Sequence, residues 1–174
     1  MIIRQYIKVW QNNLNGKMSS ILDFKREAIA KGLCKQYRNK WDNAQSKKDL
    51  VDIALDANGI EYMAEMLNEG WGLTPEHIHK EFADYINGRY EKKHNGYKTA
   101  MYVMYNGELT TSCTAYLLAS CNIKVVIPKN CVCRLFICAG SNVMIDCEGD
   151  CEVYCYEDKS QVREITGAGS VDLK

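Results

Sequence analysis

The chain has 174 residues, which is enough for one domain or two small ones. Its 22 basic and 22 acidic residues cancel, so net charge favours neither nucleic acid nor a membrane surface as a partner. Charged residues interrupt the N-terminal stretch, and no run approaches the roughly 20 apolar residues of a membrane span. We therefore expect a cytoplasmic protein that has no membrane partner.

Residues 21–41 carry apolar side chains at every third or fourth position, which predicts an amphipathic helix. Gly32 lies in its middle, where glycine costs about 1 kcal/mol relative to alanine. The opposite face of this helix is basic. It is either a solvent-exposed face or a surface that contacts nucleic-acid phosphates. The candidate residues for that contact are Lys25, Arg26, Lys31, Lys35 and Arg38.

Three more helices are predicted before residue 88. Ser46-Lys-Lys-Asp49 has the form of a capping box and begins a helix that Asn58-Gly59 would end. A third helix is expected at about 60–69. The fourth begins with Thr74 as N-cap and Pro75 in the first helical position. We assign residues 1–88 to a helical domain of about four helices.

After Gly88 the apolar period changes to two, which indicates short β-strands. Asn95-Gly96 and Asn106-Gly107 are typical hairpin turns, because both positions of such a turn need positive φ. From Cys113 to Glu157 similar residues recur every ten positions, and the recurring apolar residues are odd-numbered. One such row reads Cys113, Ile123, Cys133, Val143 and Val153.

Odd positions of a strand share one face, so the same face of every unit is apolar. The predicted fold class is α+β, with the helical domain followed by a β-repeat domain at 89–160. The repeat is either a β-solenoid or an antiparallel meander. Strict register favours the solenoid, because stacked coils place equivalent residues over one another. Residues 161–174 break the register and are expected to form a cap or a tail.

Nine cysteines invite a chemical interpretation, but seven of the eight in the β half are odd-numbered. Free cysteine behaves as a small apolar residue, so these thiols are expected to fill the core. A disulfide framework is disfavoured by the odd total and the absence of a secretory signal. A zinc site stays open as an alternative if three cysteines converge in a solenoid. Those residues are Cys121, Cys131 and Cys151.

The even-numbered face of the repeat is too apolar for a fully solvated surface. It is covered by the protein's own helices, by a second copy or by a partner. Aromatic residues, methionine and arginine together are typical of protein interfaces. The candidate partner-binding residues are Tyr116, Phe136, Met144, Tyr154 and Tyr156.

The stretches Trp41–Gly59, Gly70–Glu76 and Tyr85–Tyr90 resemble a group of short uncharacterised proteins from gut bacteria and their phages. The resemblance covers most of residues 20–157. It implies no catalytic residue, ligand or cofactor. It implies an accessory protein of a phage or mobile element, which would act by binding and inhibiting a host protein.

No phosphate-binding glycine loop or nucleophile elbow occurs in the sequence. We therefore expect no enzymatic activity and no cofactor, and we expect a non-catalytic protein that binds a protein partner or itself. The alternatives are a nucleic-acid-binding module that uses the basic first helix, and a zinc-binding structural protein.

Overall fold

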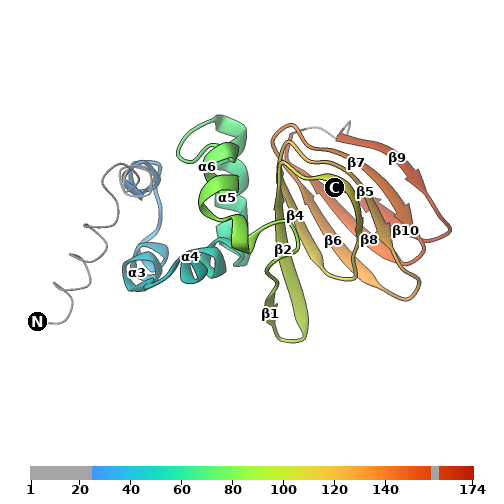
Figure 1. The fold of residues 1–174 in the computed structure, drawn as a ribbon, viewed down its shortest axis with the longest axis horizontal. Helices are drawn as coiled ribbons and strands as arrows, with labels where there is room; N and C mark the ends of the chain where they lie inside the picture. The colour runs from blue at the N-terminus through green and yellow to red at the C-terminus, as the bar shows by residue number, and fades with distance from the viewer. Residues whose placement is uncertain (1–24, 158–160) are drawn as a thin grey trace, which may run out of the picture.

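The computed structural model describes residues 25–157 and 161–174. A helical region comes first and a β-solenoid of parallel strands follows, so the predicted α+β class and the solenoid are both confirmed (Figure 1). The described helices end before the first strand begins. After helical residues 25–30, the helical region contains α3 (Lys35–Asn43), α4 (Lys47–Ala54), α5 (Ala57–Glu69), α6 (Pro75–Glu81) and the short 3₁₀ helix η1 (Ala83–Tyr85).

The prediction of one long helix over residues 21–41 is wrong, because the helix ends at Gly32. Residues 25–30 are helical, and residues 21–24 lie outside the described range. Gly32 has φ +99°, and the Leu33 amide donates to the Ala28 carbonyl at 2.8 Å. This is the left-handed ending of a helix, which glycine adopts without strain. The chain then turns into α3.

The capping box before α4 is confirmed. The Asp49 amide donates to Ser46 Oγ at 3.2 Å, and the Ser46 amide donates to an Asp49 carboxylate oxygen at 2.9 Å. The stop expected at Asn58-Gly59 is wrong, since both residues lie in the first turn of α5. A Cβ on Gly59 would lie 2.1 Å from the Ile53 carbonyl oxygen, so glycine here allows α4 and α5 to approach closely.

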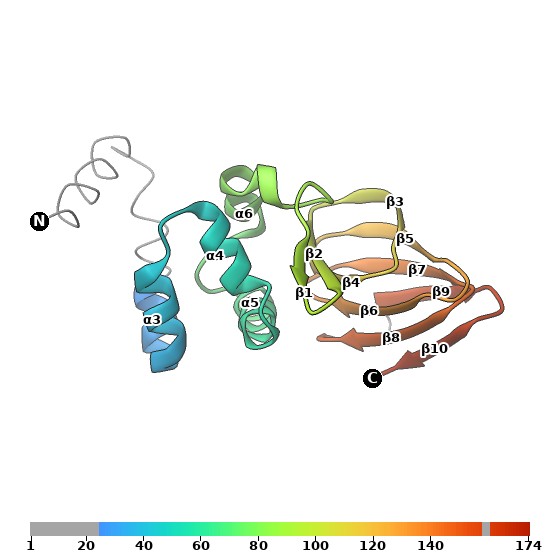
Figure 2. The ribbon, with the colours of Figure 1, turned by 90° about the horizontal axis from the view of Figure 1, so that it is seen from below.

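The solenoid consists of two sheets whose strands alternate along the chain. Sheet A has the order β1-β2-β4-β6-β8-β10, and sheet B has the order β3-β5-β7-β9 (Figure 2). All neighbours pair in parallel except β1 and β2, which form the predicted hairpin at Asn95-Gly96. The strands are β1 (Lys92–His94), β2 (Tyr97–Val103), β3 (Asn106–Thr110), β4 (Thr114–Ala119), β5 (Asn122–Ile127), β6 (Val132–Ile137), β7 (Asn142–Cys147), β8 (Asp150–Cys155), β9 (Val162–Thr166) and β10 (Ser170–Leu173).

Each unit of about ten residues is therefore half a coil. Stacked partners lie twenty residues apart between β4 and β6 and between β5 and β7, and eighteen apart between β6 and β8. Ala115 pairs with Leu135 in sheet A, and Val125 pairs with Ile145 in sheet B. All four side chains are at most 1 % exposed and form the core between the sheets. The odd-numbered apolar rows from β4 to β8 thus face inward, as the alternation predicts.

Two expectations for the β region need correction. Asn106-Gly107 makes no hairpin turn, because both residues belong to β3 and pair in parallel with Asn122 and Ile123. Residues 161–174, expected to be a cap or tail, contain β9 and β10, which continue the two sheets. The pairing of β7 with β9 shifts register between Val143 and Met144, so Val162 and not Arg163 lies opposite Val143. The charged Arg163 therefore interrupts the apolar row, although Ile165 still pairs with Ile145 at twenty residues.

Candidate protein-binding surface

The helices cover one part of the outer face of sheet A. Helix α5 packs against β4, and α6 packs against β2 (Figure 2). Tyr116 and Leu118, which point outward from β4, are 5 % and 0 % exposed and belong to the core shared with the helices. Tyr116, one of the predicted partner-binding residues, is therefore not accessible to a partner. Its aromatic ring is buried by the protein's own helices.

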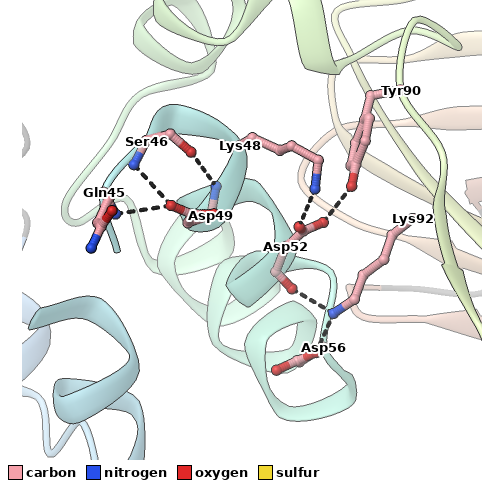
Figure 3. A network of polar contacts seen from close by, with 8 residues as sticks. All are labelled: Gln45, Ser46, Lys48, Asp49, Asp52, Asp56, Tyr90 and Lys92. Carbon is pink, nitrogen blue, oxygen red and sulfur yellow. Dashed lines mark hydrogen bonds and ion pairs between the residues drawn. The ribbon is translucent and has the colours of Figure 1, made fainter. Parts of the chain in front are cut away.

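A polar network connects the helices to the first strand, and we call it the α4–β1 clasp (Figure 3). Lys92 Nζ of β1 donates to the Asp52 carbonyl at 2.6 Å and forms an ion pair with Asp56. The Tyr90 hydroxyl donates to Asp52 Oδ1 at 2.6 Å. The clasp consists of Lys40, Lys48, Asp52, Asp56, Tyr90 and Lys92.

The Asp56 carboxylate forms ion pairs with two lysines of the clasp, Lys40 and Lys92. Partial burial raises its pKa, but hydrogen bonds from Lys40 and Lys92 outweigh burial, so the pKa of Asp56 lies below its ordinary value. The Lys40 Nζ to Asp56 Oδ2 distance is 2.6 Å. Asp56 therefore stays ionised in mild acid and connects α3 to the strand side of the molecule.

The described helices cover the rest of the outer face of sheet A only at its edge, where Asn68 Nδ2 of α5 donates to the Tyr156 carbonyl at 3.4 Å. Val132 is 69 % exposed and Tyr97 is 76 % exposed, and the Arg134 side chain is also exposed. Phe136 and Tyr154 are half-buried. We call this surface the open face, and it consists of Tyr97, Val132, Arg134, Phe136, Glu152, Tyr154 and Tyr156.

An aromatic stack crosses the centre of the open face. The Phe136 and Tyr154 ring centroids are 4.8 Å apart with planes at 7°, and Phe136 lies 4.8 Å from the buried Tyr116. These separations equal the strand spacing of a parallel sheet, because the three rings occupy one row of registered residues. The Tyr156 ring is 6.4 Å from Phe136. Stacking in register fixes the rings without help from a ligand.

Charges beside the stack neutralise one another. Glu152 accepts from Arg134 Nε at 2.8 Å and from Lys174 Nζ at 3.1 Å. These two hydrogen bonds hold the pKa of Glu152 below its ordinary value. Lys174 Nζ also lies 5.1 Å from the centroid of the Tyr154 ring, within cation–π range. The open face thus has an apolar centre beside compensated charges.

The structure divides the predicted partner-binding residues between different surfaces. Phe136, Tyr154 and Tyr156 lie on the open face. Met144, which is 41 % exposed, lies on the outer side of sheet B in the row of Lys124. Lys124 forms ion pairs there with Asp146 and Glu108, at 3.2 and 3.8 Å. Met144 therefore cannot act together with the aromatic stack.

Two exposed residues of the open face were not selected from the sequence. Val132 is even-numbered and follows the parity that places Phe136 and Tyr154 outward. Tyr97 is odd-numbered, but parity reverses in β2, where Tyr102 faces the core and Met101 faces the helices. The reversal arises because Met101 pairs with Tyr116, only fifteen positions later. The turn sequence Asn95-Gly96 does not predict this reversal of parity in β2.

The basic residues considered for nucleic acid do not form one uniform surface. Lys25 pairs with Asp42, and Lys31 Nζ lies 3.0 Å from Glu69 Oε2. Arg38 Nε donates to the Leu33 carbonyl at 2.6 Å. Lys35 and Arg26 are exposed, but the break at Gly32 places them on different helical segments. Much of the predicted basic face is thus engaged in contacts within the helical region.

The cysteines considered for zinc are not brought together. Cys121 is buried at the corner after β4, where its amide donates to Ser141 Oγ at 3.2 Å, whereas Cys151 pairs with Cys133 inside sheet A. Across residues 25–157 and 161–174, no three metal-ligating side chains form a group that would hold a metal ion. All nine cysteines are free thiols, and burial raises the pKa of Cys121 and Cys138. Of the odd-numbered cysteines in the β region, four are buried and serve as core residues, as expected: Cys121, Cys133, Cys147 and Cys151.

Comparison of the chain with protein-family models, curated proteins and solved structures finds no match. In the part of the chain that the structure describes, no helix combines the length and the apolarity that crossing a membrane requires.

Proposed function

We propose that this protein acts by binding another protein through the open face. The observation that carries the proposal is the combination of exposed Val132 and Tyr97 with the Phe136–Tyr154 stack on a surface that the described helices cover only at its edge. Rigid aromatic rings lose little conformational entropy on binding, and tyrosine and arginine are enriched at the centres of interfaces. A registered sheet provides such a platform in advance.

The compensated charges favour a partner that is apolar at the centre of the contact. Arg134 and Lys174 are already paired with Glu152, so a strongly charged partner would have to break these pairs. We further propose an accessory or inhibitory role without catalysis. That finer statement rests on the sequence resemblance to proteins of gut bacteria and their phages.

The test substitutes the most exposed residues of the open face. Val132→Asp and Tyr97→Asp each introduce a charge at a position where the exposed side chain contributes little to folding. Both variants and the wild-type chain serve as bait for lysate of the source cells, and captured proteins are quantified. We expect the recovery of a specific partner to fall about tenfold or more with either variant, because a buried unpaired charge disfavours the complex.

Met144→Asp is the matched control. It places the same charge on an outward apolar residue of sheet B, so the proposal requires that it keep wild-type capture. Phe136→Asp is less informative, because Phe136 contacts three other rings and its loss would also weaken folding. Equal capture by wild type, Val132→Asp and Tyr97→Asp would exclude the open face as the binding surface.

A further inference from the structure

The helical region also forms an apolar cavity, partly open at the surface, that the open face does not explain. Its volume is about 90 Å³, and its walls come from α3, α4, α5, α6 and β2. A single water needs only roughly 10–15 Å³ on this kind of measure, so the space can hold a group of several heavy atoms. Lining residues include Leu33, Trp41, Leu50, Tyr62, Ile78 and Phe82.

The walls offer almost nothing for hydrogen bonding. Aliphatic and aromatic side chains make up the lining, and the Tyr62 hydroxyl already donates to the Ala28 carbonyl at 2.7 Å. Water needs two to four polar partners to occupy a buried site, so it is poorly held here. An occupant that makes no hydrogen bonds is the one that suits these walls.

Cations near the cavity are already neutralised. Lys40 pairs with Asp56 while lying 4.6 Å from the Tyr37 ring, and Lys47 pairs with Glu81 while lying 5.8 Å from the Phe82 ring. Lys25, which lies 6.0 Å from the Trp41 ring, pairs with Asp42. An anionic headgroup would therefore compete with existing ion pairs, which disfavours a fatty acid or another charged lipid.

We propose that this cavity is a binding site for a small, uncharged, apolar molecule about the size of one aromatic ring or a short branched alkyl group. The site is separate from the open face, so it stands or falls independently of the proposed protein binding. Apolar cavities of about 150 Å³ are known to stay dry and take up benzene. The present cavity is smaller but partly open, so a single aromatic ring is the upper limit of what it would accept.

The experiment uses the full 174-residue chain with methyl groups of Leu, Ile and Met labelled for NMR. Benzene is the probe, and cyclohexanol of similar size tests the cost of one hydroxyl. We expect saturable shift changes at the methyls of Leu50, Ile78 and Met63, with half-saturation at about millimolar benzene. Cyclohexanol should bind at least about tenfold more weakly, because its hydroxyl finds no partner.

Ala54→Leu adds bulk to the lining, and Ala57→Leu adds the same bulk at an exposed position three residues later. The first variant should abolish the benzene shifts and the second should keep them. Shifts that persist in Ala54→Leu, or that occur mainly at solenoid methyls, would overturn the proposal. A full chain without saturable shifts would overturn it too.

Discussion

A single missing Cβ at position 59 determines how closely α4 and α5 approach. A methyl group there would lie 2.1 Å from the Ile53 carbonyl oxygen and 3.0 Å from that of Ala54. Both atoms belong to the backbone and cannot rotate away. Gly59 has an ordinary helical conformation, so its value lies in the absence of a side chain and not in left-handed φ.

Gly59→Ala is therefore expected to destabilise the protein, although alanine is the better helix former by about 1 kcal/mol. Overpacking against fixed backbone should lower the free energy of unfolding by about 2 kcal/mol. Urea unfolding followed by far-ultraviolet circular dichroism measures this change. Asn58→Ala, in the same helical turn but exposed, should stay within about 0.5 kcal/mol of wild type. A stabilised Gly59→Ala would show that the helices are free to separate.

At the scale of elements, the α4–β1 clasp joins three helices to the first strand of the solenoid. Its ion pairs lie at the edge of the apolar contact that α5 makes with β4. An isolated surface ion pair contributes little to stability, but a carboxylate shared by two ordered lysines contributes more. The clasp therefore orients the helices while apolar burial holds them.

We expect Asp56→Asn to lower stability at pH 7 by about 1 kcal/mol, because Lys40 and Lys92 lose their shared carboxylate. The folded-state pKa of Asp56 is depressed, so its contribution is complete above the ordinary carboxyl pKa of about 3.9. It is lost as pH falls through the folded-state value. Stability of wild type should thus fall more steeply below about pH 4 than that of the variant.

Chemical denaturation from pH 2.5 to 7 makes this comparison. Asp42→Asn is the control, since Asp42 pairs with Lys25 but its side chain is 62 % exposed. The control should keep both the stability and the acid dependence of wild type. Parallel pH profiles for wild type and Asp56→Asn would mean that the clasp carboxylate does not contribute to stability.

At the scale of the whole molecule, cysteine side chains fill part of the solenoid core. Five thiols are buried, three are intermediate and Cys34 is exposed at the start of α3. Burial raises the pKa of Cys121 and Cys138, which keeps these thiols protonated and unreactive. We expect a thiol-specific reagent to label Cys34 first under native conditions, and the five buried thiols only after urea is added.

Cys34→Ser should remove the fast phase of labelling, which mass spectrometry of labelled peptides would verify. The counterpart Cys138→Ser should leave that phase intact, because Cys138 is fully buried between the solenoid and the helices. Rapid labelling of Cys133 or Cys151 in the native protein would contradict the closed core described for this region.

The solenoid was predictable because parallel stacking imposes a long repeat that local sequence alone does not require. The helix caps at Ser46 and Thr74 were predictable for the opposite reason, since each depends on a few neighbouring residues. The hairpin prediction at Asn106-Gly107 is wrong because the pairing of β3 with β5 overrides a local turn preference. The burial of Tyr116 depends on where α5 docks, which no periodicity in either half encodes.

The two-strand coil also limits how this chain can change in length. Inserting or deleting one full coil would keep each later strand in its own sheet, with its outward residues on the same side. A change of ten residues would preserve inward and outward parity but exchange the sheets for everything downstream. Phe136 and Tyr154 would then move to the side of Met144, away from the helices. Gene rearrangements that keep the open face intact must therefore come in multiples of two strands.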